Sequence, residues 1–200
     1  MDSEQKTTLT WIIGAVAVLG IALPFILKGN QSLSGDLARA VQKSDVYKVT
    51  QLLETGVDPN TRILPSDDGA NSKARLTLLM YTALHDQTNI AQVLLDHHAN
   101  LELRDFTNGD TALGWAARRG SLNMELLLLN HGARLDVVDP AGDTPVTLAA
   151  RSGQLECVRL LVSHGARVDV QTGQEASPLE AAKESGNAEL IAYLRSLHSR

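Results

Sequence analysis

The chain is poor in the features that mark several classes of protein. It holds one cysteine, Cys157, so no disulfide can form within it, and Cys157 is expected to be a small buried hydrophobic residue. The net charge is -5, which argues against a nucleic-acid surface because such a surface needs a basic patch. These absences leave a protein whose fold must rest on aliphatic packing.

Motifs for chemistry are also missing from the sequence. It has no glycine-rich phosphate loop, no nucleophile elbow and no pair of cysteines. Three histidines, His97, His131 and His164, recur at one position of a repeat, but stacked helices lie about 10 Å apart, too far to share a metal ion. We expect these histidines near helix C-termini, where positive charge is favoured. The sequence therefore predicts no enzyme, no catalytic residue, no metal and no cofactor.

The chain does contain one segment that occurs in two similar copies. The first copy, GDTALGWAARRGSLNMELLLLNHGARLDVVD, starts at Gly109, and the second, GDTPVTLAARSGQLECVRLLVSHGARVDVQT, starts 33 residues later at Gly142. A fixed period of this length indicates a stack of repeats, in which each unit buries one face against its neighbour.

Each copy reads as two helices joined by tight turns. Thr111 and Thr144 are candidate caps for the first helix, and Gly120 and Gly153 stand where that helix should end in a left-handed residue. Alanines allow the two helices to approach closely. Aliphatic side chains in the second helix predict a buried stripe: Leu122, Leu126, Leu127, Leu155, Val158, Leu160 and Leu161.

These residues resemble the ankyrin repeat, whose pattern has Thr-Pro-Leu-His, a pair of alanines, a glycine, a Leu-Leu pair and Gly-Ala. The resemblance implies an all-α solenoid of about five helix-turn-helix repeats over residues 35–200. The copies do not keep the family's histidine. The repeats fall approximately at 35–60, 77–108, 109–141, 142–174 and 175–197, with a polar loop insertion at 61–76.

An uncharged run of 17 residues, Trp11–Leu27, precedes the repeats. Its length is at the short end for a membrane-spanning helix, and Trp11 suits the membrane interface. We expect a short tail at 1–10, one transmembrane anchor at 11–28 and a linker at 29–34. Two other interpretations stay open: a cleaved signal peptide, disfavoured by the acidic start and the lack of a cleavage motif, and a buried soluble helix.

The side of the membrane on which the repeats lie has two interpretations. Lys28 and the lysine and arginine of the first repeat favour the cytoplasmic side. A single N-terminal anchor more often exports the domain that comes after it, which favours the periplasmic or exported side of a cell (inner) membrane. We expect the exported side, with the cytoplasmic face as the alternative.

The resemblance also implies a binding face, made of turn tips and the exposed parts of the first helices. Carried onto this chain, it predicts that a protein partner contacts Arg118, Arg119, Arg151, Phe106, His85 and Asp143. Arginine and aromatic side chains dominate interface hot spots. Charge reversal at Arg118 and Arg151 is expected to weaken binding and leave the helices intact.

The expected function is that of a membrane-anchored module for protein–protein interaction. It would act as an adaptor or stabiliser of a membrane or exported enzyme. The alternative is an immunity or inhibitor protein that neutralises a toxic effector enzyme at the membrane. A fold of this kind does not name the partner, because function lies in the site and not in the scaffold.

Overall fold

The computed structural model describes residues 33–63, 75–169 and 177–198. The expected tail at 1–10, the expected anchor at 11–28 and most of the linker at 29–34 lie outside these residues. Among the helices that the structure describes, none combines the length and the apolar character needed to cross a membrane. The anchor therefore stays a prediction from the sequence.

The described residues form helix pairs that follow the predicted repeats. A helix over residues 33–42 pairs with α2, Val46–Glu54. The remaining pairs are α3 (Leu78–Leu84) with α4 (Thr88–Asp96), α5 (Ala112–Arg119) with α6 (Leu122–Asn130), α7 (Pro145–Arg151) with α8 (Leu155–Ser163), and α9 (Pro178–Ser185) with α10 (Ala188–His198). This gives the five helix-turn-helix units that the sequence predicts, numbered here as repeats 1 to 5.

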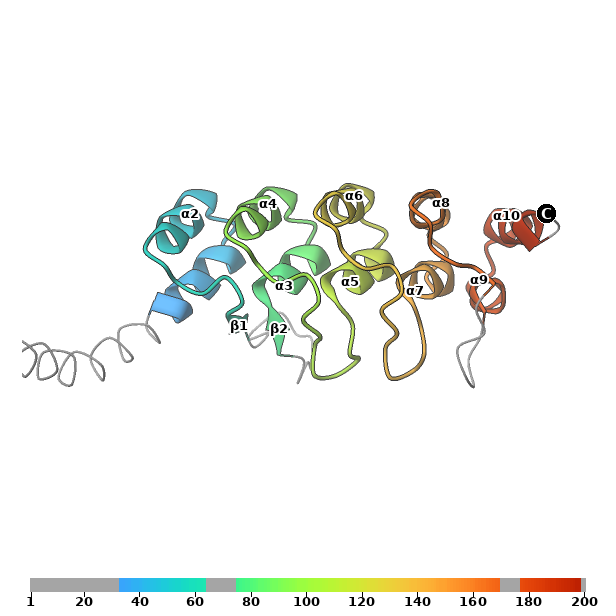
Figure 1. Cartoon of the computed structure of the whole chain (residues 1–200), viewed down its shortest axis with the longest axis horizontal. Coiled ribbons are helices and arrows are strands. Elements are labelled where there is room, and N and C mark those ends of the chain that lie inside the picture. The colour runs from blue at the N-terminus through green and yellow to red at the C-terminus, as the bar shows by residue number, and fades with distance from the viewer. Residues whose placement is uncertain (1–32, 64–74, 170–176, 199–200) are drawn as a thin grey trace, which may run out of the picture.

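The pairs stack side by side into an elongated solenoid (Figure 1). The second helices α2, α4, α6, α8 and α10 make one row, and the first helices make a second row beneath it. The long turns between repeats project beyond the row of first helices, on the side away from the row of second helices. Residues at the loops and at the ends of the first helices therefore share one side of the stack.

Hydroxyl caps set the start of the first helices. The Thr111 side chain accepts a hydrogen bond from the backbone N–H of Gly114, and Thr144 accepts one from Thr147. Thr77 and Ser177 cap α3 and α9 in the same way. A cap of this kind stabilises a helix by about 1 kcal/mol. The predicted capping role of Thr111 and Thr144 is confirmed.

The turn after each first helix needs a residue with positive φ. Gly120 and Gly153 supply it, with φ of 78° and 72°. The same turn in repeat 2 is made by Asp86 at φ 55°, and His98 takes φ 64° after α4. A side chain in this region costs about 1–2 kcal/mol, so repeat 2 keeps the family backbone at a cost that glycine avoids.

The core is aliphatic and runs along the whole stack, but one part of the predicted stripe is wrong. Leu122 and Leu126 are 40% and 43% exposed, whereas Met124, Glu125 and Leu128 of the same helix are buried. The segment Leu122–Asn130 is apolar on nearly every side, so its pattern did not define the inward face. Packing against the neighbouring repeats determines that face instead.

The expected loop at 61–76 begins and ends in a short sheet. β1 (Arg62–Ile63) pairs antiparallel with β2 (Leu76–Thr77), with Arg62 opposite Thr77. Ile63 and Leu76 are buried, so the ladder ties the ends of the insertion to the core. Residues 64–74, the middle of the insertion, lie outside the described residues.

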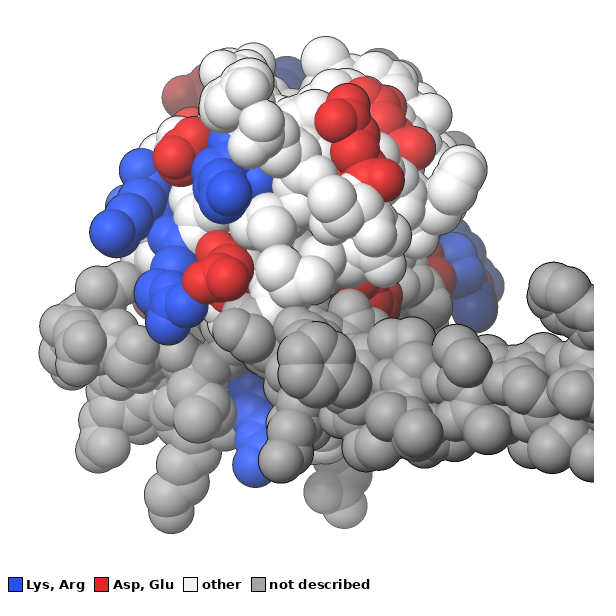
Figure 2. Space-filling view, turned by 90° about the vertical axis from the view of Figure 1, so that its left-hand side faces the viewer, with Lys and Arg blue, Asp and Glu red and all other residues white. Residues whose placement is uncertain are grey.

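The end of the stack at repeat 1 has no face of a single charge. Basic side chains lie along one edge of this view with acidic ones among them, and an uncharged area lies between these and a second acidic group (Figure 2). Charges of both signs on one surface fit the small net charge of the chain.

Candidate protein-binding surface

Arg118, on the last turn of α5, is joined to two buried aspartates. Its Nε donates to Asp110 Oδ2 at 2.7 Å, and its Nη2 lies 3.6 Å from Asp139 Oδ2. The Asp110 side chain is 1% exposed, while a third of the Arg118 side chain remains in solvent. Burial raises the pKa of Asp110 to about 6, although the Arg118 guanidinium acts to lower it. The Arg118 head group is thus largely committed within the protein.

Arg151, the equivalent residue on α7, makes a fuller set of contacts. Its Nε and Nη2 donate to the two carboxylate oxygens of Asp143, at 3.2 and 2.8 Å. Its Nη1 donates to Glu184 on α9, at the next repeat. Asp143 itself is 4% exposed, so it contributes little surface to a partner. The forked pair holds the loop of repeat 4 against its first helix.

These contacts correct the expected outcome of charge reversal. A glutamate at 118 or 151 would face a buried aspartate of the same sign, so the stack would lose stability along with any binding. The two effects cannot be separated at these positions. The sequence does contain a signal for the pairing, because Asp110–Arg118 and Asp143–Arg151 are both eight residues apart and recur 33 residues later.

Arg119 differs from its two neighbours in the predicted set. It is exposed at the C-terminal end of α5 and forms no ion pair with the described residues. Its guanidinium is therefore available for forked hydrogen bonds to a carboxylate. Of the three predicted arginines, Arg118 and Arg151 are held in ion pairs within the protein, and Arg119 is not held in one by the described residues.

Phe106 lies in the loop after α4 and is 68% exposed. The Arg62 guanidinium sits over its ring, 4.6 Å from the centroid. Arg62 also donates to the backbone carbonyls of Arg75 and Arg104, at 2.7 and 2.9 Å. The ring is therefore exposed on one face and packed against Arg62 on the other. A side chain held in this way has little conformational freedom to lose when a partner binds.

The same loop is shaped by a buried aspartate that the sequence did not single out. Asp105 accepts hydrogen bonds from the backbone N–H groups of Thr107, Asn108 and Asp110. Its Oδ2 also accepts one from the Trp115 indole at 3.0 Å. These bonds fix the turn next to Phe106, because each removes an alternative conformation of the loop.

His85 lies at the C-terminal end of α3, where it is exposed. Its ring stacks on Tyr81, with centroids 4.2 Å apart and the planes tilted by 38°. The other histidines behave as expected, since His97, His131 and His164 are the C-terminal caps of α4, α6 and α8. In the described ranges no three His, Cys, Asp or Glu side chains group so that they could hold a metal ion.

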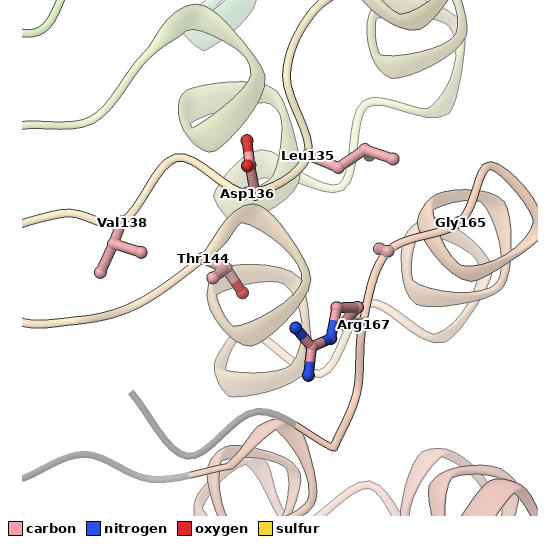
Figure 3. Close-up of a pocket in the computed structure, with 7 residues that line it drawn as sticks. Leu135, Asp136, Val138, Thr144, Gly165 and Arg167 are labelled. Atoms are coloured by element: carbon pink, nitrogen blue, oxygen red, sulfur yellow. The ribbon is translucent and has the colours of Figure 1, made fainter. Parts of the chain in front are cut away.

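A hollow of about 340 Å³ lies between the loops of repeats 3 and 4 (Figure 3). Leu135 and Val138 contribute apolar side chains, and the charged groups of Asp136 and Arg167 stand beside it. Thr144, Gly165 and Ala166 complete the lining. Sequence reasoning missed this feature, because it depends on the gap between two loops and not on one motif.

Comparison with known proteins agrees with this architecture. A family profile described as Ankyrin repeats (3 copies) matches residues 37–139 and 124–199. The chain belongs to the ankyrin-repeat family. Ankyrin repeats imply a module for protein–protein interaction, and the long turns and first helices described above make up the side of the stack on which the predicted contact residues lie.

Two kinds of curated relative share these ankyrin repeats. The human "Cyclin-dependent kinase 4 inhibitor B" is 35% identical over 118 residues, which is 58% of this chain and 78% of the inhibitor. The human "Palmitoyltransferase ZDHHC13" is 27% identical over 121 residues, which is 60% of this chain. The chain spans only 18% of the length of that palmitoyltransferase.

Proposed function

We propose that this ankyrin-repeat protein binds a protein partner through the side of the stack formed by the loops and the first helices. The observation that carries the proposal is that the exposed side chains Phe106 and Arg119 lie on a loop and a helix end that internal contacts hold in place. Phe106 projects from a loop fixed by Arg62 and Asp105, and Arg119 projects beside the internally paired Arg118. Binding on such a surface loses little side-chain freedom.

The remaining predicted contacts have a different part in this proposal. Arg118 and Arg151 hold the loops in position through their buried aspartate partners. Asp143 acts through Arg151, because its own carboxylate is buried. The hollow beside Leu135 and Val138 offers room for an apolar side chain of the partner.

The partner class we favour is an enzyme located at a membrane, which the protein recruits or stabilises as an adaptor. The anchor in this proposal is the uncharged run Trp11–Leu27, and we place the repeats on the exported side. A second candidate function is inhibition of an enzyme, as an immunity protein would do. The likeness to a protein named as a kinase inhibitor favours it, since that relative is covered over 78% of its length.

Site-specific photocrosslinking tests the binding side. A photoreactive residue is placed at Phe106, at Arg119, or at Asn123, an exposed control on α6 in the opposite row of helices. We expect the first two positions to give the same discrete adduct in cells and Asn123 to give none. An adduct that forms equally well from Asn123 would contradict the assignment.

The membrane part needs its own test. The full chain should stay with membranes through alkaline extraction, and the Leu19→Arg variant, which places a charge in the middle of the run, should be released. Protease added after only the outer barrier is opened should digest a C-terminal tag. A tag that survives until the inner membrane is broken would place the repeats in the cytoplasm.

A further inference from the structure

The core of repeat 3 contains a glutamate where the other repeats have an apolar side chain. Glu125 on α6 is 0% exposed. The equivalent residues are Val49, Ala91, Val158 and Ile191, found by the spacing of the repeats. A carboxylate has thus replaced an aliphatic group at the point where neighbouring second helices pack.

The surroundings of Glu125 offer its charge almost no compensation. Neither carboxylate oxygen accepts a hydrogen bond of regular geometry from the described residues, and the weak thiol of Cys157 is the one donor that acts on the group. Cys157 on α8, 2% exposed, faces it from repeat 4, and its thiol is a weak donor. No cation is among the groups that act on Glu125, and the exposed Glu156 adds negative charge near Cys157.

The other elements packed around α6 present apolar groups. The buried residues of α4 are Ile90, Ala91, Leu94 and Leu95. The buried residues of α5 are Ala112, Leu113, Gly114, Ala116 and Ala117, and those of α8 are Cys157, Val158 and Leu161. Glu125 therefore sits in a site that accepts a neutral side chain and resists a charged one.

Protonation resolves this conflict within the ordinary pH range. Burial raises the pKa of Glu125 to about 7 from 4.5, and the Cys157 thiol lowers it only in part. A raised pKa favours the protonated form in the folded state. Its contribution to stability is complete below about pH 4.5 and is lost as the pH rises through 7. Burial and the nearby carboxylates also raise the pKa of Cys157, so the thiol stays protonated over this range.

We propose that the contact between α6 and α8 is a pH-responsive joint, closed when Glu125 is protonated and loosened when it is ionised. Loosening weakens the packing of repeat 4 on repeat 3 in the row of second helices, while α5 and α7 stay in contact in the row of first helices. Arg118 lies on one side of the joint and Arg151 on the other. The joint is a property of the fold and does not depend on the function proposed above.

The test compares the full-length protein with two variants at pH 5.5 to 8.5. Glu125→Gln keeps the shape of the side chain and removes its charge. Glu125→Val introduces the residue found at the equivalent position of repeat 4. We expect the melting temperature of the wild type to fall by about 5–10 °C relative to Glu125→Gln over this range, with most of the fall below about pH 7 and a plateau above it. Glu156→Gln is the matched control and should follow the wild type.

Amide hydrogen exchange locates the effect. Above pH 7, protection in α6 and α8 should fall in the wild type and stay high in Glu125→Gln, after correction for the intrinsic pH dependence of exchange. Parallel melting curves for the wild type and Glu125→Gln would overturn the proposal. A loss of protection spread evenly over repeats 1 to 5 would also overturn it, because the joint would then not be the part that opens.

Discussion

Repeats 3 and 4 are built on nearly the same sequence and show which features a repeat must keep. Both begin with a threonine cap, turn at a left-handed glycine and end the second helix at a histidine. Several buried positions differ between them, and at one of these the charge differs too, because repeat 3 has Glu125 where repeat 4 has Val158. The comparison teaches that local backbone signals fix the repeat, while its core tolerates a change that alters its response to pH.

The two repeats also differ in how they hold their loops. Asp143 receives a forked pair of hydrogen bonds from Arg151, whereas Asp110 receives one hydrogen bond from Arg118 and keeps an oxygen without a partner among the described residues. The same two residue types at the same spacing thus give a better satisfied pair in repeat 4 than in repeat 3.

The largest expected effect comes from copying the core of repeat 3 into repeat 4. Val158→Glu should lower the free energy of unfolding by about 3–5 kcal/mol at pH 8, because it buries a charge without a partner. The loss should be smaller at pH 5, where the carboxyl group is protonated. Denaturant unfolding at both pH values measures it.

Val158→Ala is the control for the volume that is lost and should cost roughly 2 kcal/mol at either pH. If Val158→Glu is no less stable than Val158→Ala at pH 8, the core of the stack accepts a charge at this position, and the contrast between the repeats disappears.

An intermediate effect is expected from the aspartates that hold the loops. Asp143→Asn should cost about 1–2 kcal/mol at pH 7, because it weakens the forked, charge-assisted pair with the partly exposed Arg151. Asp110→Asn should stay within about 0.5 kcal/mol of the wild type. The raised pKa of Asp110, about 6, means that its ionised form already opposes folding at pH 7.

The stability of Asp110→Asn relative to the wild type should also depend on pH. Relative to the wild type, this variant should gain stability as the pH rises through 6, where Asp110 ionises in the folded protein. Thermal unfolding at pH 4.5 and 7 checks it, and an equal loss for the two variants would show that the two pairs are equivalent.

The last contrast is steric and separates the two turn glycines. Gly153→Ala should cost about 1 kcal/mol through its left-handed φ alone, since an added Cβ meets Ser185 Cβ at 3.4 Å, an ordinary contact. Gly120→Ala should cost about 2 kcal/mol, because its Cβ would lie 2.4 Å from Gln154 Oε1 and displace that side chain. Urea unfolding of both variants ranks them, and the reverse order would show that Gln154 moves aside freely.

The sequence predicted the architecture well because its signals are local and repeated. Thr111, Gly120 and the alanines of α5 each act within a few residues, so their effect could be read without the fold. The family resemblance then supplied the stacking. Asp86 and His98 stand at positions where the family pattern has glycine, and both adopt the left-handed conformation there, so the resemblance located these two turns although the residues themselves give no such signal.

The parts that depend on contacts between repeats could not be read in the same way. Leu126 and Glu125 are adjacent, and the helix Leu122–Asn130 is too uniformly apolar to show which of them faces inward. The pairing of Arg118 and Arg151 was missed for another reason, since each arginine pairs with an aspartate of its own repeat. The recurring eight-residue spacing was the signal, but a charged residue on a binding face and one in an ion pair otherwise look alike in sequence.

The most direct test of the contrast between repeats 3 and 4 is to titrate the carboxyl carbon of Glu125 by ¹³C NMR, assigned with Glu125→Gln. We predict a midpoint near pH 7, set by burial against Cys157. A midpoint near the ordinary value for glutamate, about 4.3, would contradict the proposed joint, because the side chain would then be reaching solvent or a partner that neutralises its charge.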